Sequence, residues 1–182
     1  MKKNTHLLWP VAIALCTIFA SCKKDKEKEA TLPPATQTGA NTFGCYINGK
    51  LYIPQGFEQN RSNFEMIVDP GFNDGSIVIK TFNKANGNSS INFSLGSDSI
   101  RGLGFFPSTS RTGFVYTIYN TGGNICQTIS QYENSIAGFL KITRYDLQNK
   151  IISGEFEFHF SNPNCGIGDP INITQGRFDK KF

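Results

Sequence analysis

Apolar and polar residues alternate in short segments along most of the chain after residue 41. The two clearest segments are residues 89–97, with apolar Ile91, Phe93 and Leu95, and residues 151–160, with apolar Ile152, Phe156, Phe158 and Phe160. A period of two places one set of side chains on each face of a β-strand. We therefore expect Glu155, Glu157 and His159 to share the face opposite the apolar set.

Six further segments have the same strand character, at residues 45–53, 64–68, 76–82, 114–120, 136–145 and 171–182. Between segments lie turn-forming dipeptides, namely Asn48-Gly49, Pro70-Gly71, Asp74-Gly75, Asn86-Gly87 and Gly122-Gly123. No helical period of useful length interrupts them. The pattern predicts an all-β domain over residues 41–182, an antiparallel β-sandwich or barrel of about eight strands.

Two local details refine this prediction. In the last segment Ile171 and Ile173 are odd-numbered, whereas Phe178 is even-numbered, so the pattern changes phase near Gly176. One extra residue, a β-bulge, produces such a change; the alternative is a frayed end. Residues 146–150 are expected to form a hairpin loop in which the Asp146 side chain accepts hydrogen bonds from turn amides. Residues 102–107 are assigned to a loop.

The N-terminus has the features of an export signal. Two lysines precede an apolar run over residues 7–19, which is shorter than the roughly 20 residues of a membrane-spanning helix. Small residues then lead to Cys22, in a pattern that resembles the lipobox of bacterial lipoproteins. The resemblance implies a signal peptide over residues 1–21 and acylation of Cys22. The alternative is ordinary signal cleavage that leaves Cys22 as a free thiol.

Residues 22–40 are first charged and then rich in Pro, Thr and Ala, which predicts a disordered tether. Loss of two signal lysines leaves 16 basic and 14 acidic side chains, a net charge of +2. A balance so near neutral argues against nucleic acid as a partner. Acidic residues just after Cys22 resemble surface-export signals of Bacteroidota lipoproteins. We expect an outer-membrane location, with surface exposure favoured over a periplasm-facing orientation.

Three stretches, residues 44–54, 138–158 and 171–182, resemble an uncharacterised family of Bacteroidota lipoproteins. Its members share Asn-Gly-Lys preceded by Gly and followed by Pro, a later Ile-Thr-x-x-Asp then Ser-Gly-x-Phe, and a closing Gly-Arg-Phe-Asp. The resemblance covers most of residues 43–182 and implies lineage and β architecture. It implies no activity, ligand or catalytic residue, and the motifs themselves are typical of turns and strands.

Three cysteines remain in the domain, and export would place them where disulfides form. If the hairpin turn centres near residue 148, antiparallel residues opposite each other sum to about 295. Cys126 and Cys165 sum to a similar value, so the pattern favours a Cys126–Cys165 disulfide with Cys45 spare. The alternative is that all three are reduced.

Candidate catalytic chemistry is sparse. His159 is the only histidine after the signal segment, and with Glu155 and Glu157 it could bind a metal or transfer protons. The simpler interpretation is a solvated strand face, since no second histidine or metal-spaced cysteine pair accompanies it. Nucleophile-elbow, P-loop and dinucleotide motifs do not occur. We predict no cofactor, no metal site and no enzymatic activity.

These observations favour a lipid-anchored envelope protein that acts as a binding or interaction module, with a glycan or an envelope protein as partner. Gly- and Asn-rich loops at residues 83–90 and 119–126 are typical of mutable binding platforms. The alternatives are an accessory role in an outer-membrane complex or, with less support, glycan processing. Asp98-Ser99-Ile100 resembles an O-glycosylation signal of exported Bacteroidota proteins, with Ser99 as the candidate acceptor.

Overall fold

The computed structural model describes residues 30–86, 89–107, 114–119, 125–129, 137–160 and 170–182, and within these ranges the regular elements are eleven β-strands. In spatial order, the six-stranded sheet contains β2 (Lys50–Tyr52), β1 (Thr42–Ile47), β11 (Ile171–Lys181), β10 (Ile151–Phe160), β9 (Ala137–Asp146) and β6 (Gly104–Pro107). The five-stranded sheet contains β3 (Phe64–Asp69), β4 (Ser76–Asn86), β5 (Ser89–Asp98), β7 (Phe114–Tyr119) and β8 (Ile125–Ile129). All paired strands are antiparallel.

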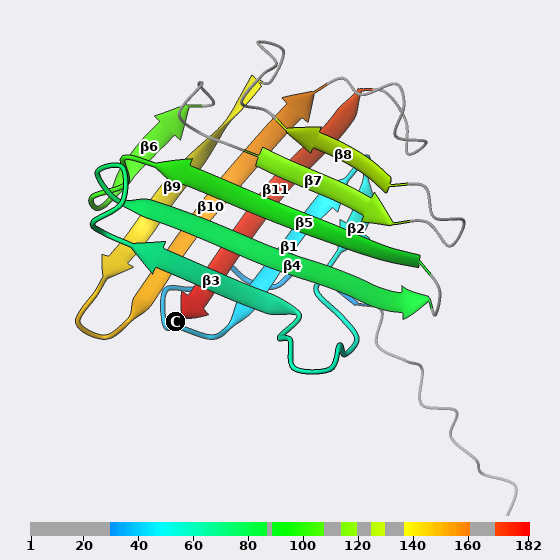
Figure 1. Ribbon diagram of the computed structural model, residues 1–182, viewed down its shortest axis with the longest axis horizontal. Coiled ribbons are helices and arrows are strands. Elements are labelled where there is room, and N and C mark those ends of the chain that lie inside the picture. Colours follow the sequence, from blue (N-terminus) through cyan, green and yellow to red (C-terminus); the bar gives the residue numbers. More distant parts are fainter. Residues whose placement is uncertain (1–29, 87–88, 108–113, 120–124, 130–136, 161–169) are drawn as a thin grey trace, which may run out of the picture. The chain divides into compact units, whose positions relative to one another are not determined.

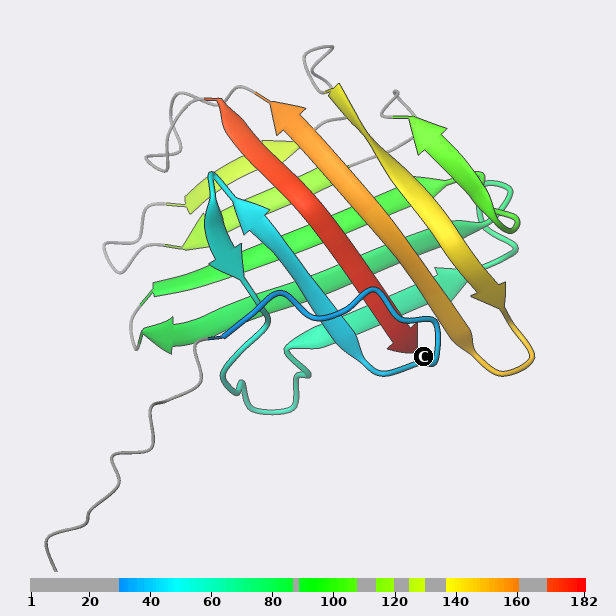
Figure 2. The ribbon, with the colours of Figure 1, turned by 180° about the vertical axis from the view of Figure 1, so that it is seen from behind.

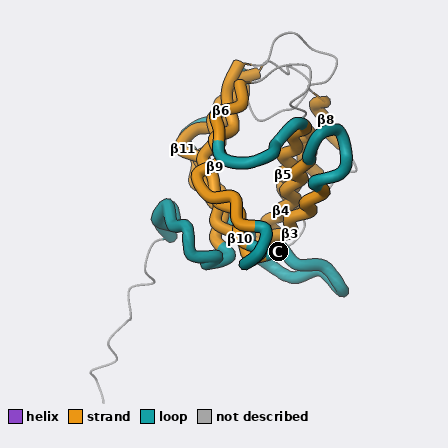
Figure 3. Tube along the Cα trace, turned by 90° about the vertical axis from the view of Figure 1, so that its left-hand side faces the viewer, coloured by secondary structure: helices purple, strands orange, loops and turns teal. Residues whose placement is uncertain are grey.

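The two sheets pack face to face, as Figures 1 and 3 show. Buried side chains from both sheets form one core cluster; Phe43 and Phe156 come from the six-stranded sheet, and Ile79 and Leu95 come from the other. The predicted all-β fold is confirmed, in its sandwich form. The strand number exceeds the predicted eight because β2 is separate from β1, and because β6 and β8 were missed. Residues 104–107, assigned to a loop, form β6.

The predicted bulge in β11 is confirmed. Phe156 of β10 pairs with Gly176, but Phe158 pairs with Ile173, so β11 contains one residue more than β10 in this interval. The positive φ of 52° falls on Gln175. Gly176 is required for a different reason, since a Cβ there would lie 2.3 Å from the Phe156 ring.

Two of the predicted turns are confirmed in detail. Asn48 and Gly49, which join β1 to β2, have φ angles of 48° and 76°, as a two-residue hairpin turn requires. In the turn between β9 and β10, Asp146 Oδ1 accepts a hydrogen bond from the Asn149 amide at 2.9 Å. Together with hydrogen bonds from the side chains of Arg144 and Asn149, this contact holds the pKa of Asp146 well below its usual range, and the hydrogen bond from Arg144 contributes most.

The predicted tether over residues 22–40 is wrong for its second half, because the compact unit begins at Thr31. Residues 31–40, here called the strap, run across the outer face of the six-stranded sheet over β1 and β11 (Figure 2). Leu32 and Pro33 pack where Gly44 leaves room, since a Cβ on Gly44 would lie within 3 Å of both side chains. A segment poor in apolar residues is ordered here because its few apolar side chains and its polar groups find partners on the sheet.

Candidate functional site

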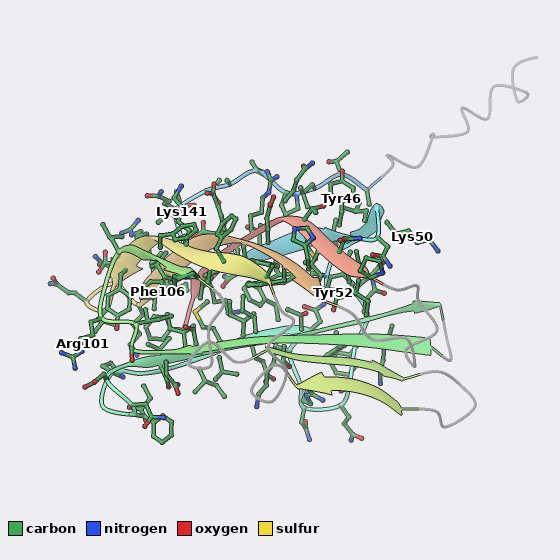
Figure 4. The ribbon with its side chains drawn as sticks, turned by 90° about the horizontal axis from the view of Figure 1, so that it is seen from above. Tyr46, Lys50, Tyr52, Arg101, Phe106 and Lys141 are labelled. Carbon is green, nitrogen blue, oxygen red and sulfur yellow. The ribbon has the colours of Figure 1, made fainter. Side chains whose placement is uncertain are left out.

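A recess of about 230 Å³ lies on the outer face of the six-stranded sheet. The side chains around it come from the strap and from β9, β10 and β11, and they include Ala35, Phe139, Glu155, Glu157, Gln175 and Arg177. Figure 4 shows the two layers edge-on, with Lys141 on this outer side and Tyr52 between the layers. The recess thus lies on the face opposite the core.

Strand alternation and the bulge together assemble this site. Alternation in β10 turns Glu155 and Glu157 outward, as predicted, while Phe156 between them is fully buried. The extra residue in β11 brings both Gln175 and Arg177 to the rim of the recess. Bulges of this kind re-aim side chains and are over-represented beside functional sites.

The charged groups at the recess are held in place by specific contacts. The Lys141 ammonium donates a hydrogen bond to Glu155 Oε2 at 3.1 Å, and the backbone amide of Gln175 donates one to Glu157 Oε1 at 3.2 Å. Arg177 Nε donates to the Gln175 carbonyl oxygen at 3.3 Å. Within the described part of the chain these contacts use one oxygen of each carboxylate and one N–H of the guanidinium. A carboxylate accepts up to four hydrogen bonds and a guanidinium donates five, so capacity for a ligand remains.

An aromatic pair adjoins these polar groups. Phe105 of β6 is 62% exposed and stacks on Phe139 of β9, with ring centroids 5.0 Å apart and planes at 24°. Phe139 also lines the recess. The sequence interpretation missed this pair because it placed residues 102–107 in a loop. The sequence Gly-Phe-Phe-Pro of β6 has two adjacent phenylalanines instead of an alternating pattern, so it carries no signal of a strand with one exposed ring.

The predicted set of Glu155, Glu157 and His159 does share one strand face. Its members nevertheless have separate partners, and His159 Nδ1 lies 2.9 Å from Asn172 Oδ1. In the described ranges no group of three His, Cys, Asp or Glu residues is arranged to hold a metal ion. The geometry therefore groups the two glutamates with Arg177 rather than with His159.

Of the domain cysteines, Cys45 is fully buried with a free thiol, and burial raises its pKa well above the usual range. Cys165 and the side chain of Cys126 lie outside the described residues. The hairpin argument for pairing them is wrong, because Cys126 belongs to β8, which pairs with β7 in the other sheet. The Cys126–Cys165 disulfide itself stays a prediction.

The structure describes Ser99, the candidate glycosylation site, but not Cys22, the candidate lipidation site. Ser99 follows β5 in a turn with φ of 63°, and its side chain is partly exposed. Cys22 and the predicted signal peptide at residues 1–21 lie outside the described residues, as do the Gly-rich loop at residues 120–124 and residues 87–88. Across the described ranges, no helix has the length and apolar character needed to cross a membrane.

A second charged cluster lies on the other sheet, where the loop at residues 53–63 covers Phe82. Glu58 forms ion pairs with Arg61 and Lys84, and both cations lie within 6 Å of the Phe82 ring centroid. The hydrogen bond from Lys84 is the main cause that lowers the pKa of Glu58. The charges of these groups are paired with one another, which is typical of contacts that hold a loop on a sheet and not of a ligand site.

No family model, curated protein or solved structure matches this chain.

Proposed function

We propose that this protein is a lipid-anchored, non-catalytic binding module of the bacterial outer membrane, and that the recess is its ligand site. The observation that carries the proposal is the bulge in β11. It holds a non-glycine residue, Gln175, at positive φ. It also places Arg177 at a recess lined by two outward carboxylates and by the partly buried ring of Phe139, which stacks on the exposed ring of Phe105. Backbone strain of this kind costs roughly 1–3 kcal/mol, and it clusters at sites where function requires a particular geometry.

A sugar ring fits the chemistry of this site. The apolar C–H face of a pyranose packs against an aromatic face such as that of Phe139, whose π system carries partial negative charge. Its hydroxyls can donate to Glu155 and Glu157 and accept from Arg177. Typical small-molecule pockets measure about 300–1,000 Å³, so a recess of about 230 Å³ suits one sugar unit rather than a long segment.

The contacts at the two glutamates support binding over hydrolysis. A glycosidase acid must carry a proton that it can deliver to the leaving oxygen. Glu155 is instead ion-paired with Lys141, and Glu157 accepts an amide hydrogen bond from Gln175. Carboxylates held in this way are suited to accept hydroxyl hydrogen bonds. An accessory role in an outer-membrane complex and glycan processing remain as alternatives that the following test separates.

The first prediction concerns Phe139. The purified full-length chain is expected to bind one class of immobilised oligosaccharide, and Phe139→Ala is expected to weaken that binding about tenfold, or about 1.4 kcal/mol, because the stacking surface is lost. Arg177→Met should weaken it similarly. Phe72→Ala is the matched control, since Phe72 is 56% exposed in the turn between β3 and β4, on the other sheet.

Equal weakening by the control variant would show that the effect is not local to the recess. Binding that is unaffected by Phe139→Ala and Arg177→Met would overturn the assignment of the site. A lack of glycan binding together with co-purification of an outer-membrane protein would favour the accessory role. Release of free sugar from a bound glycan would favour the enzyme.

The second prediction concerns the lipid anchor. Cys22→Ala is expected to move the protein from the membrane fraction to the aqueous fraction of the native host, because a multi-chain anchor gives lasting attachment. Cys16→Ala is the control, since Cys16 follows a large residue, Leu15, and does not fit the lipobox. Blotting of the two fractions measures the distribution. Retention of Cys22→Ala in the membrane would contradict the assignment.

A further inference from the structure

One carboxylate, that of Asp179, holds the strap on the sheet. Asp179 is 1% exposed and lies in β11 beside β10. Its oxygens accept hydrogen bonds from Thr36 Oγ1 at 2.7 Å, the Thr38 amide at 2.9 Å, the Gly39 amide at 2.8 Å, the Ala40 amide at 3.0 Å and Ser153 Oγ at 2.7 Å. Four of these five donors belong to the strap.

The remaining strap contacts are few. Arg144 donates a hydrogen bond to the Gln37 carbonyl oxygen, Leu32 and Pro33 pack over Gly44, and Gly39 lies against the side chains of Ile151 and Lys181. The strap contains no strand, and the core cluster begins only at Phe43. Loss of the strap therefore leaves the interior of the sandwich intact. Segments with few apolar contacts and an exposed backbone open locally, at a lower free energy than global unfolding.

We propose that the strap opens as a unit while the sandwich stays folded, and that the Asp179 carboxylate is its latch. Because four strap donors meet at one carboxylate, loss of that acceptor frees all of them together. Opening also removes Ala35 from the wall of the recess, so the strap controls the shape of that site. The consequence for ligand binding rests on the proposed function, whereas the opening itself is independent of any ligand.

Amide hydrogen exchange of the wild-type, full-length chain tests the opening directly. The amides of Thr38, Gly39 and Ala40 are expected to exchange at least a hundredfold faster than the paired amides of β10 and β11. Their rates should also be insensitive to low urea concentrations, since a small opening exposes little surface. Strap amides that exchange at the same rate and with the same urea dependence as β10 would overturn the proposal.

Two variants test the latch. Asp179→Asn is expected to accelerate strap exchange at least tenfold while the relative protection of β10 and β11 is kept. Thr36→Val, which removes one donor without touching the sheet, should accelerate it severalfold and serves if Asp179→Asn does not fold. The control is Asp69→Asn, because Asp69 also accepts hydrogen bonds from backbone amides, those of Gly71 and Phe72, but is the last residue of β3 in the other sheet. Unchanged exchange of the strap amides in both variants would show that other contacts hold the strap. No ligand is used in this experiment, so a failure of glycan binding leaves its result unaffected.

Discussion

Asp179→Asn is expected to lower the free energy of unfolding by about 3 kcal/mol at pH 7. The carboxylate is almost fully buried and accepts five close hydrogen bonds, and an asparagine side chain would turn two N–H donors toward groups that are themselves donors. Removing the charged partner from such a buried network costs roughly 2–5 kcal/mol. Urea unfolding of the wild type and the variant measures the difference.

The same difference should depend on pH. Burial raises the pKa of Asp179, but the hydrogen bonds from Ala40, Thr36, Ser153 and Thr38 outweigh burial and lower the pKa below its usual range. A group with a depressed pKa contributes stability that is complete above its unfolded pKa of about 3.9 and is lost as the pH falls toward the folded value. The difference in the free energy of unfolding between wild type and Asp179→Asn should therefore be smaller at pH 3 than at pH 7, by about 1 kcal/mol. A gap that stays constant from pH 7 to pH 3 would show that the charge of Asp179 is not what stabilises the fold.

Sequence pattern predicted those features whose causes are local. Alternation in residues 151–160 identified β10 and its outward glutamates, and the phase change identified the bulge in β11. The motifs that carry the family resemblance have structural roles, as their composition indicated. Asp146 closes the turn after β9, and Ser153 donates to Asp179 in the closing motif.

The strap and the recess depend on partners that are distant in the chain. Thr36 and Asp179 are separated by 143 residues. The local composition of residues 31–40 does not show that their hydrogen-bond donors bind a buried carboxylate. The recess likewise combines the strap with three strands. Phe105 and Phe139 meet only because β6 pairs with β9, which a four-residue strand does not reveal in sequence. Local periodicity therefore predicts strands and faces, whereas sites built across strands require the register between them.

Gly176→Ala is expected to lower the free energy of unfolding by about 2–3 kcal/mol, since overpacking a filled core typically costs 1–3 kcal/mol. A Cβ at this position would lie 2.3 Å from Cε2 of Phe156, a ring that is fully buried and stacks on Phe43 with centroids 5.4 Å apart. The ring has little freedom to move away. Gly102→Ala is the control, because a Cβ on Gly102 would meet no atom within 4 Å, and we expect a change within about 0.5 kcal/mol.

A double-mutant cycle identifies the cause. In a Phe156→Leu background the smaller side chain relieves the clash, so the cost of Gly176→Ala should fall by at least about 1 kcal/mol. Equal costs in the two backgrounds would instead assign the requirement for glycine to the backbone of the bulge. A lower cost in the Phe156→Leu background would mean that the missing Cβ of Gly176 lets the Phe156 ring lie directly beneath the recess. The packing of Phe156 and the shape of the candidate ligand site would then have a common cause.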